Sequence, residues 1–235
     1  MARLRRMREL IGRGVQAREA AQAVLAGEPV VVAGDNPAES RRELGHAVEA
    51  VHYASIASML DELFSVEGTV RTWNEVVAPV LRSMGDRWAR GEECYAAEWA
   101  LATEVSAAID RHVRSFELQP VAGSVLLACC PGERHSLPVE VLGGALAEAR
   151  IPTVLLGGMV PPDTTRAMVA KTEPAIVVLW STLPETADTG LRDSLHEGGT
   201  RLCLAGPGWG NLTGGEFPQV DDLAGAVALI GRLVG

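Results

Sequence analysis

The sequence predicts an α/β protein with an all-α part: a four-helix bundle followed by a doubly wound parallel sheet. Two observations support this prediction. Residues 36–118 carry apolar side chains at helical spacing and contain no strand-like run. Residues 123–235 alternate short apolar runs with helix-like segments, which is the pattern of parallel strands joined by crossover helices. Ahead of both, residues 1–30 are rich in arginine and predict a basic helical hairpin.

The helical part opens on a start signal. Asn36 can cap a helix, Pro37 suits the first helical position, and Glu39 stands three residues after the cap. Apolar residues at helical spacing then recur in the stretches 46–64, 73–88 and 92–113, with breaks at residues 67–69 and at Gly91. Helices with such short joins favour an antiparallel four-helix bundle over residues 36–118.

The second part contains four apolar runs that read as buried strands, at residues 124–130, 153–157, 175–180 and 201–206. Helical segments are expected between and after them, near residues 138–149, 162–172, 185–196 and 222–234. Strands that are apolar throughout are typical of a parallel sheet with helices on both faces. Residues 123–235 are therefore expected to form one α/β domain.

The composition of the chain argues against several classes of function. The chain of 235 residues has a net charge of −9, which argues against nucleic acid binding by the bulk of the chain. Its four cysteines form no CxxC pair, so neither a zinc site nor a disulfide framework is indicated. No signal peptide and no apolar run long enough for a membrane span is found. We therefore expect a cytoplasmic protein without a membrane partner.

The loops after the strands are the candidate site, because ligands of such sheets bind beyond the carboxyl ends of the strands. The loop after the first strand, residues 132–138, reads GERHSLP and offers an imidazole and a carboxylate. The loop after the third strand, residues 181–184, reads STLP and offers two hydroxyls. The loop after the fourth strand, residues 206–210, reads GPGWG, whose glycines let the backbone approach a bulky ligand. Taken alone, the histidine could be a metal ligand, a catalytic base or a plain loop residue.

Taken together, the three loops resemble the signature of B12-binding domains. That signature is an acidic residue, any residue and a histidine, then Ser-x-Leu, then a glycine pair. Here Glu133-Arg134-His135, Ser181-Thr182-Leu183 and Gly206-Pro207-Gly208 stand in this order and at matching spacing. Two positions depart from it, since Pro138 replaces a glycine and Pro207 splits the glycine pair. Neither departure removes a ligand.

The helical part adds a second resemblance. Trp88 is followed by nine residues and then Glu98, and residues 80–99 as a whole are similar to the cap of MerR-family B12-dependent photoreceptors of the CarH/LitR type. Residues 1–30 resemble the end of the MerR-type DNA-binding domain, without its recognition helix. The resemblance covers nearly the whole chain and includes the photocobilin-like subgroup, which pairs B12 with a bilin. It implies a cap followed by a Rossmann/flavodoxin-like, cobalamin-binding domain.

The resemblance implies a role for each matched residue. His135 would ligate cobalt in the base-off, His-on form, with Glu133 orienting its ring. The hydroxyl and glycine loops would line a slot for the cofactor's nucleotide tail, while Trp88 and Glu98 would cover the upper face of the corrin. The implied cofactor-binding residues are Trp88, Glu98, Trp99, Glu133, Arg134, His135, Ser181, Thr182, Leu183, Gly206, Gly208 and Trp209, and the implied metal ligand is His135.

The implied function is that of a sensor and not of an enzyme. Adenosylcobalamin would bind in the dark, light would break its cobalt–carbon bond, and the cap would change the state of a homo-oligomer, a dimer or a tetramer. Transcription or a partner would respond, with DNA bound weakly or not at all by this chain alone. Ala89 stands where the best-known sensors of this type have a histidine, and Trp99 replaces the cap histidine. We therefore expect no stable bis-histidine state after illumination.

Three alternatives stay open. A photoreceptor could bind a bilin such as biliverdin beside B12, since Trp99 adds an aromatic ring near the corrin. A corrinoid carrier could shuttle a methyl group between methyltransferase partners, because carriers share the fold and the histidine loop. An interaction module could have this fold and bind no corrinoid.

Overall fold

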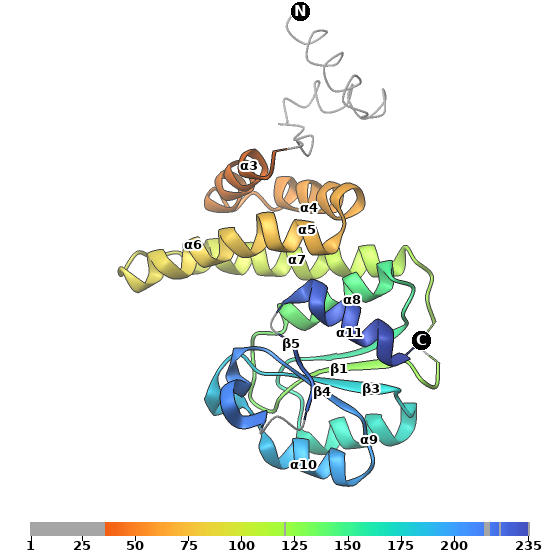
Figure 1. Cartoon of the computed structure of the whole chain (residues 1–235). Coiled ribbons are helices and arrows are strands. Elements are labelled where there is room, and N and C mark those ends of the chain that lie inside the picture. The colour runs from red at the N-terminus through yellow and green to blue at the C-terminus, as the bar shows by residue number, and fades with distance from the viewer. Residues whose placement is uncertain (1–35, 120, 214–216, 221, 235) are drawn as a thin grey trace, which may run out of the picture. The chain divides into compact units, whose positions relative to one another are not determined.

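The computed structural model describes residues 36–119, 121–213, 217–220 and 222–234. The predicted basic hairpin over residues 1–30 lies outside this range. The chain divides into two compact units, of which the second begins at Ile109. This boundary falls inside helix α7 (Tyr95–Arg114) (Figure 1).

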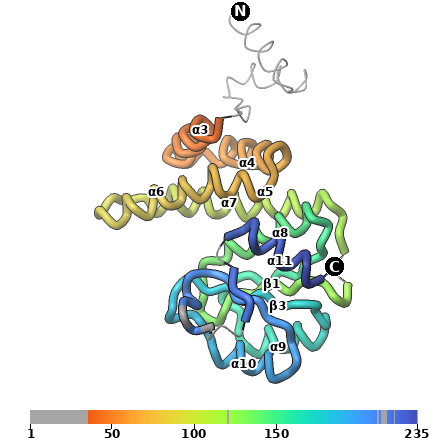
Figure 2. The backbone as a smooth tube through the Cα atoms, viewed as in Figure 1, coloured from red at the N-terminus to blue at the C-terminus, as the bar shows by residue number. Residues whose placement is uncertain are grey.

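The helical unit consists of helices joined by short turns, which the tube in Figure 2 follows from α3 onward. Its elements are α3 (Pro37–Glu49), α4 (Tyr53–Glu67), α5 (Thr69–Thr72), the π-helix η1 (Trp73–Val77), α6 (Ala78–Ala89) and the first part of α7. The elements α5, η1 and α6 follow one another without a break. The start signal is confirmed, because the side chain of Asn36 accepts a hydrogen bond from the amide of Ala38 at 3.0 Å.

The predicted apolar stretch over residues 46–64 is not one helix. Helix α3 ends at Glu49, Val51 takes a left-handed conformation with φ of 52°, and α4 begins at Tyr53. The amide of His52 closes the turn by donating to the carbonyl of Ala47 at 3.0 Å. The sequence has neither glycine nor proline at this break. The helical spacing of the apolar residues continues across it, so the sequence pattern did not reveal the break.

The π-helix η1 ends two residues before Pro79. Pro79 has no amide hydrogen, so the carbonyl of Glu75 loses its usual helical partner. Arg41 of α3 supplies the missing donor, with its Nη1 at 2.7 Å from that carbonyl oxygen. The widened turn just before a proline is therefore held in place by a guanidinium from the neighbouring helix.

The α/β unit is built on a five-stranded parallel sheet in the order β2-β1-β3-β4-β5. The strands are β1 (Val125–Cys129), β2 (Thr153–Gly157), β3 (Ile176–Trp180), β4 (Leu202–Ala205) and β5 (Gln219–Val220). The helices are α8 (Leu137–Glu148), α9 (Pro162–Thr172), α10 (Thr189–Glu197) and α11 (Leu223–Val234), with 3₁₀ turns η2 (Pro184–Thr186) and η3 (Pro207–Thr213). The fold class and the four predicted strands are confirmed, and the two-residue β5 was not predicted.

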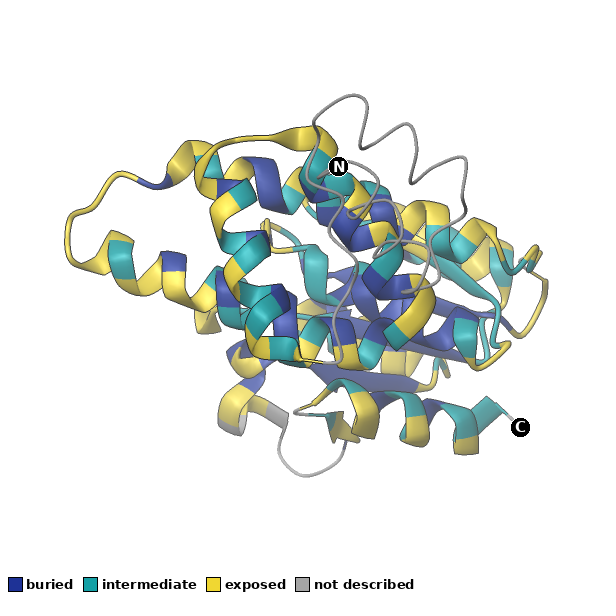
Figure 3. Ribbon diagram, turned by 90° about the horizontal axis from the view of Figure 1, so that it is seen from above, coloured by how far each residue is buried: buried dark blue, intermediate teal, exposed yellow. Residues whose placement is uncertain are grey.

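Alternate strand residues supply two separate hydrophobic cores. On one face, Leu126 and Val177 pack with Leu191 and Leu195 of α10. On the other face, Leu127 packs with residues of α8 and α11 such as Leu142 and Ile230. The central strands β1, β3 and β4 are accordingly buried, whereas the edge strand β2 is half-buried (Figure 3). Burial on both faces explains why β1, β3 and β4 each read as a continuous apolar run.

The strand order places a topological switch point between β1 and β3, where consecutive connections leave the sheet in opposite directions. Crevices at such points are the usual ligand sites of open α/β sheets. None of the helices among the described residues is long and apolar enough to cross a bilayer.

Candidate cofactor site at the carboxyl edge of the sheet

A tight turn carries the chain from β1 into the candidate site. The amide of Glu133 donates to the carbonyl of Cys130 at 3.0 Å, and the two central residues are Pro131 and Gly132. Gly132 has φ of 80°, which a type II turn requires at this position and which glycine tolerates. The amide of Cys130 donates to the carbonyl of Trp180 at 2.8 Å, so the turn is fixed to β3. The sequence Cys-Pro-Gly-Glu thus places the Glu133 side chain at the switch point.

Glu133 and His135 form the centre of the site. One carboxylate oxygen of Glu133, Oε1, accepts the backbone amide of His135 at 2.8 Å and lies 2.6 Å from its Nδ1. The side chain of Glu133 is 1% exposed, whereas that of His135 is 61% exposed. The histidine ring is therefore anchored on one side by a buried carboxylate and open on the other.

Glu133 stays ionised across the physiological pH range. Burial raises the pKa of its carboxyl, but hydrogen bonds from His135, Thr182 and Thr186 outweigh burial and lower the pKa to about 2. Its second oxygen, Oε2, accepts the amide of Thr182 at 2.7 Å and the hydroxyl of Thr186 at 2.8 Å. A carboxylate can only accept hydrogen bonds, so Nδ1 of His135 must carry the proton. The lone pair of the neutral ring is then on Nε2, which makes His135 and not Glu133 the available metal ligand.

Two hydroxyl groups continue this network within the segment that follows β3. The hydroxyl of Ser181 donates to the carbonyl of Leu183 at 2.8 Å and lies 2.8 Å from the hydroxyl of Thr186. Thr186 also lies within 3.0 Å of the same Leu183 carbonyl. Thr186 was not among the residues predicted from the sequence. Thr186 stands in a polar turn five residues after Ser181, and nothing in that stretch of sequence marks it as a site residue. Only its hydrogen bond to Glu133 reveals that it belongs to the site.

The glycines after β4 permit a close approach between two loops. The amide of Gly208 donates to the carbonyl of Ser181 at 2.9 Å. A Cβ atom at Gly206 or at Gly208 would collide with Ser181, and one at Gly208 would also collide with the carbonyl of Leu183. Gly206 has φ of 96°, a conformation that other residues rarely adopt. The split pair Gly206-Pro207-Gly208 therefore still brings the backbone directly against Ser181.

The loop after β2 also reaches the site, although the sequence-based interpretation did not include it. The amide of Met159 donates to the carbonyl of Glu133 at 2.9 Å. Met159 has φ of 57° and is 56% exposed, an uncommon combination for a non-glycine residue. Since β2 lies beside β1 in a parallel sheet, the rule for carboxyl ends could have identified this loop.

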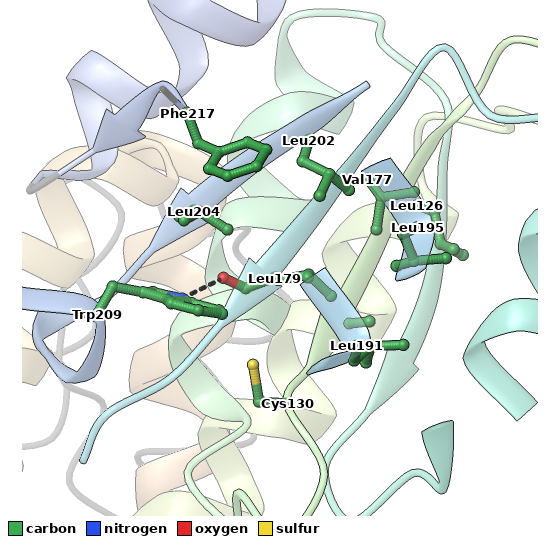
Figure 4. Packing of buried hydrophobic residues seen from close by; sticks show 11 residues of the cluster. Leu126, Cys130, Val177, Leu179, Leu191, Leu195, Leu202, Leu204, Trp209 and Phe217 are labelled. Carbon is green, nitrogen blue, oxygen red and sulfur yellow. Dashed lines mark hydrogen bonds between the residues drawn. The ribbon is translucent and has the colours of Figure 1, made fainter. Parts of the chain in front are cut away.

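The remaining predicted residues of the α/β unit fall into two groups. Arg134 and Leu183 are exposed, so a ligand at this edge can reach them. Trp209 is fully buried instead, and its indole Nε1 donates to the carbonyl of Leu179 at 2.9 Å. Figure 4 shows this bond and the indole packed among leucines of the core. In this structure the Trp209 side chain supports the glycine loop from within.

Two buried thiols lie close to the site. Burial raises the pKa of Cys129 and of Cys130 to about 12. Both thiols are therefore protonated at neutral pH, and a protonated thiol is a poor metal ligand. All four cysteines are free and buried.

Trp88, Glu98 and Trp99 belong to the helical unit. The spacing of Trp88 also fitted the core of the bundle, but the residue is 56% exposed and Trp99 is 74% exposed. The indole Nε1 of Trp88 donates to the hydroxyl of Tyr95 at 2.6 Å, and the two rings meet edge to face. Tyr95 is itself 61% exposed. Trp99 stands one turn after Tyr95 on the same face of α7, and we call Trp88, Tyr95 and Trp99 together the aromatic cluster.

Comparison with known proteins gives a sequence relative and a structural likeness. The chain is 27% identical over 217 residues to the HTH-type transcriptional repressor CarH of Myxococcus xanthus, covering 84% of this chain and 72% of the repressor. No protein-family model matches the chain. The structure is similar to the monomethylamine corrinoid protein of Methanosarcina barkeri, with a TM-score of 0.65 at 15% identity, covering 84% of this chain and 100% of that one. This likeness shows that the chain has the fold of that corrinoid protein, a helical part followed by a parallel sheet with helices on both faces.

Proposed function

We propose that this chain binds a corrinoid in the base-off form, with Nε2 of His135 as the lower ligand of cobalt. One observation supports this above all others: the ring of His135 is fixed through Nδ1 by the buried, ionised Glu133, while the rest of the ring is exposed at the switch point. Neutral imidazole is a good ligand for cobalt, and a carboxylate on its other nitrogen fixes the tautomer and raises its basicity.

The residues present fit such a group. The donor set offers one imidazole nitrogen, since both oxygens of Glu133 already accept two hydrogen bonds each. Ser181, Gly206 and Gly208 lie where two loops touch, and the missing Cβ atoms let the glycine backbone lie directly against Ser181. We assign the slot for the cofactor's nucleotide tail to these residues and Thr182, with Arg134 and Leu183 at its exposed rim.

The finer proposal is a light-responsive sensor. Adenosylcobalamin, when bound, supplies a cobalt–carbon bond that light can break. By the resemblance to the cap, we assign Trp88, Glu98 and Trp99 to the upper face of the cofactor, and all three residues are exposed. The similarity to a transcriptional repressor supports a regulatory role, in which the helical unit changes the oligomeric state. Ala89 and Trp99 cannot ligate cobalt, so we expect a photoproduct without a second histidine ligand.

The alternative is a corrinoid methyl carrier, which the structural likeness to a corrinoid protein favours equally. The two proposals share the lower ligand and differ in what happens above the cobalt. A sensor needs a bond that light breaks, whereas a carrier needs access for methyltransferase partners. A bilin beside the exposed cluster of Trp88, Tyr95 and Trp99 would be a variant of the sensor.

The lower ligand is tested by titrating the purified protein in the dark with adenosylcobalamin and recording the visible spectrum. We expect a bound cofactor with a base-off, His-on spectrum that is lost in His135→Ala. His52→Ala is the matched control, because His52 is an exposed histidine in the helical unit. An unchanged spectrum and affinity in His135→Ala would show that the ligand assignment is wrong.

The sensor and the carrier are separated by light. For a sensor, green or blue light changes the spectrum of the adenosylcobalamin complex and then its elution volume on a sizing column. A photostable complex that accepts a methyl group from a methyltransferase would support the carrier instead. Repeating the experiment with biliverdin, in the wild type and in Trp99→Ala, tests the variant with a second chromophore.

A further inference from the structure

We infer that the groove between helices α3 and α6 binds a small phosphate monoester, whose phosphate is held by Arg41, Arg42 and Arg87. The two helices contact each other in the helical unit (Figure 1), and the groove between them has a volume of about 270 Å³. All residues that line it belong to the helical unit. The inference therefore goes beyond the corrinoid site and does not depend on it.

The charge of the groove is opposite to that of the surrounding unit. Residues 36–108 contain twice as many acidic residues as arginines. The groove is nevertheless lined by three arginines and one glutamate, Glu49, so its lining has a formal charge of +2. A phosphate monoester carries about −1.5 to −2 charges at pH 7 and would neutralise this lining. A single carboxylate would leave part of the positive charge uncompensated.

Two of the guanidinium groups are held in place before any ligand binds. Nη1 of Arg41 donates to the carbonyl of Glu75 at 2.7 Å. Arg87 donates through Nε to Glu92 at 2.8 Å and through Nη1 to Glu49 at 2.6 Å. These bonds use only some of the donors of each guanidinium, and the others are suited to the paired hydrogen bonds that a phosphate accepts. Side chains that are already restricted lose less conformational entropy when a ligand binds.

Arg42 is available because its ion pair is weak. Its Nη2 lies 3.5 Å from Oε1 of Glu39, and the two side chains are 62% and 47% exposed. Exposed ion pairs of this kind contribute little free energy, since water and salt screen them. A dianionic phosphate therefore competes well with the single charge of Glu39 for the Arg42 guanidinium.

The groove also offers apolar surface for the organic part of the ligand. Pro79, Val80 and Met84 of α6 line it, and Val80 and Met84 are nearly buried, so they form its floor. Ser83 adds a hydroxyl to the lining. On α3, Gly45 has no side chain, and a Cβ atom there would meet open space. A phosphate that carries an apolar ring would fit these surroundings better than inorganic phosphate.

The π-helix η1 adjoins the groove. Pro79 stands two residues after the end of η1, and Arg41 binds the carbonyl of Glu75 within it. Both Pro79 and Arg41 line the groove. Short π-helical segments inside helices occur frequently at functional sites, so the local geometry supports a binding role for this place.

Phenyl phosphate is a suitable probe, because it combines a phosphate monoester with an apolar ring. The full chain is titrated with it by isothermal titration calorimetry in a phosphate-free buffer of low ionic strength. We expect binding of phenyl phosphate and no binding of phenol. Benzoate, which has the ring and a single negative charge, should bind about tenfold more weakly, the effect of one hydrogen bond between charged groups.

Variants of the two helices locate the binding site. Arg42→Gln should weaken phenyl phosphate binding about tenfold, whereas Arg82→Gln, at an exposed position of α6 outside the groove, should leave it unchanged. Gly45→Phe fills the groove and should abolish binding, and Gly85→Phe is its control, since Gly85 also has open space around it. Circular dichroism shows whether each variant is folded. Arg42→Gln decides the question if Gly45→Phe does not fold.

Several results would overturn the inference. These are wild-type protein that does not bind phenyl phosphate, equal effects of Arg42→Gln and Arg82→Gln, and binding that survives in folded Gly45→Phe. Equal affinities for benzoate and phenyl phosphate would show that the groove does not select a phosphate. None of these results bears on the lower ligand of cobalt, because the corrinoid spectrum reports on His135 and the calorimetric titration reports on the groove.

Discussion

Glu133 holds His135 at two points, accepting its backbone amide at 2.8 Å and lying 2.6 Å from its Nδ1 with the same carboxylate oxygen. Glu133 and His135, which are two positions apart in the sequence, are thereby held together as one unit. The backbone bond fixes the loop, and the side-chain bond fixes the ring. An exposed histidine on an unconstrained loop would lose conformational entropy on binding a metal. Here the bonds to Glu133 already restrict the loop and the ring, so much of that entropy is lost before any ligand binds.

Glu133 should make the stability of the protein depend on acid. Its pKa is lowered to about 2 in the folded chain, so the carboxylate stabilises the fold above its ordinary pKa, and this contribution is lost as the pH falls from about 4.5 towards 2. The contribution is on the order of 3 kcal/mol at neutral pH. Glu133→Gln should remove this part of the pH dependence in urea unfolding curves. Glu185→Gln, an exposed carboxyl in η2, is the control and should leave the curve as it is.

Gly208 should not tolerate a side chain. A Cβ atom there would collide with Ser181 and Leu183, so Gly208→Ala must part the two loops, at a cost of about 1–3 kcal/mol in the free energy of unfolding. Gly85→Ala is the matched control, because Gly85 lies in helix α6 with open space around it. That change should be neutral or stabilise by up to about 1 kcal/mol. Equal effects of the two changes on thermal unfolding would contradict the tight loop contact.

Trp209 should behave as a core residue. Trp209→Phe removes the hydrogen bond to Leu179 and leaves unfilled volume, so we expect a loss of about 1–3 kcal/mol in stability. Bound corrinoid should keep its spectrum, since the indole has no exposed surface. If Trp209→Phe is stable but changes the spectrum of the bound corrinoid, Trp209 is a cofactor-binding residue, as the sequence led us to expect.

Trp99 should contribute little to folding. It is 74% exposed, so Trp99→Ala should change the free energy of unfolding by no more than about 0.5 kcal/mol. Phe64→Ala, at a fully buried position of the same unit, should cost about 3–5 kcal/mol. If Trp99→Ala leaves stability intact and alters the spectrum or the light response of the cofactor complex, the aromatic cluster has the proposed role. A loss of stability like that of Phe64→Ala would identify Trp99 as a packing residue.

Much of the α/β unit could be predicted from the sequence because buried parallel strands leave a strong signal. The runs around Leu127 and Val178 are apolar on both faces, so they read as strands without any alternation. The two-residue β5 is too short to leave such a signal. The break at Val51 was missed because a residue other than glycine adopts the left-handed conformation there.

Candidate site residues could be predicted from the sequence where a side chain with suitable chemistry directly follows a strand. Elsewhere the sequence was less informative. His135 and Ser181 follow strands that the pattern already identified. Thr186 was missed because its role depends on the bond to Glu133 across the site, between residues far apart in the sequence. The burial of Trp209 could not be read from its place beside two glycines, because only the path of the loop turns its indole inward.

Electron paramagnetic resonance of the bound cofactor tests the central claim most directly. The protein is prepared with histidine labelled with nitrogen-15, cobalamin is bound, and the cobalt is reduced to its paramagnetic divalent state. If His135 is the lower ligand, the lines are split in two by one labelled nitrogen, and the splitting disappears in His135→Ala. Lines split in three by an unlabelled nitrogen would show that the cofactor keeps its own base on cobalt, and this would contradict the account.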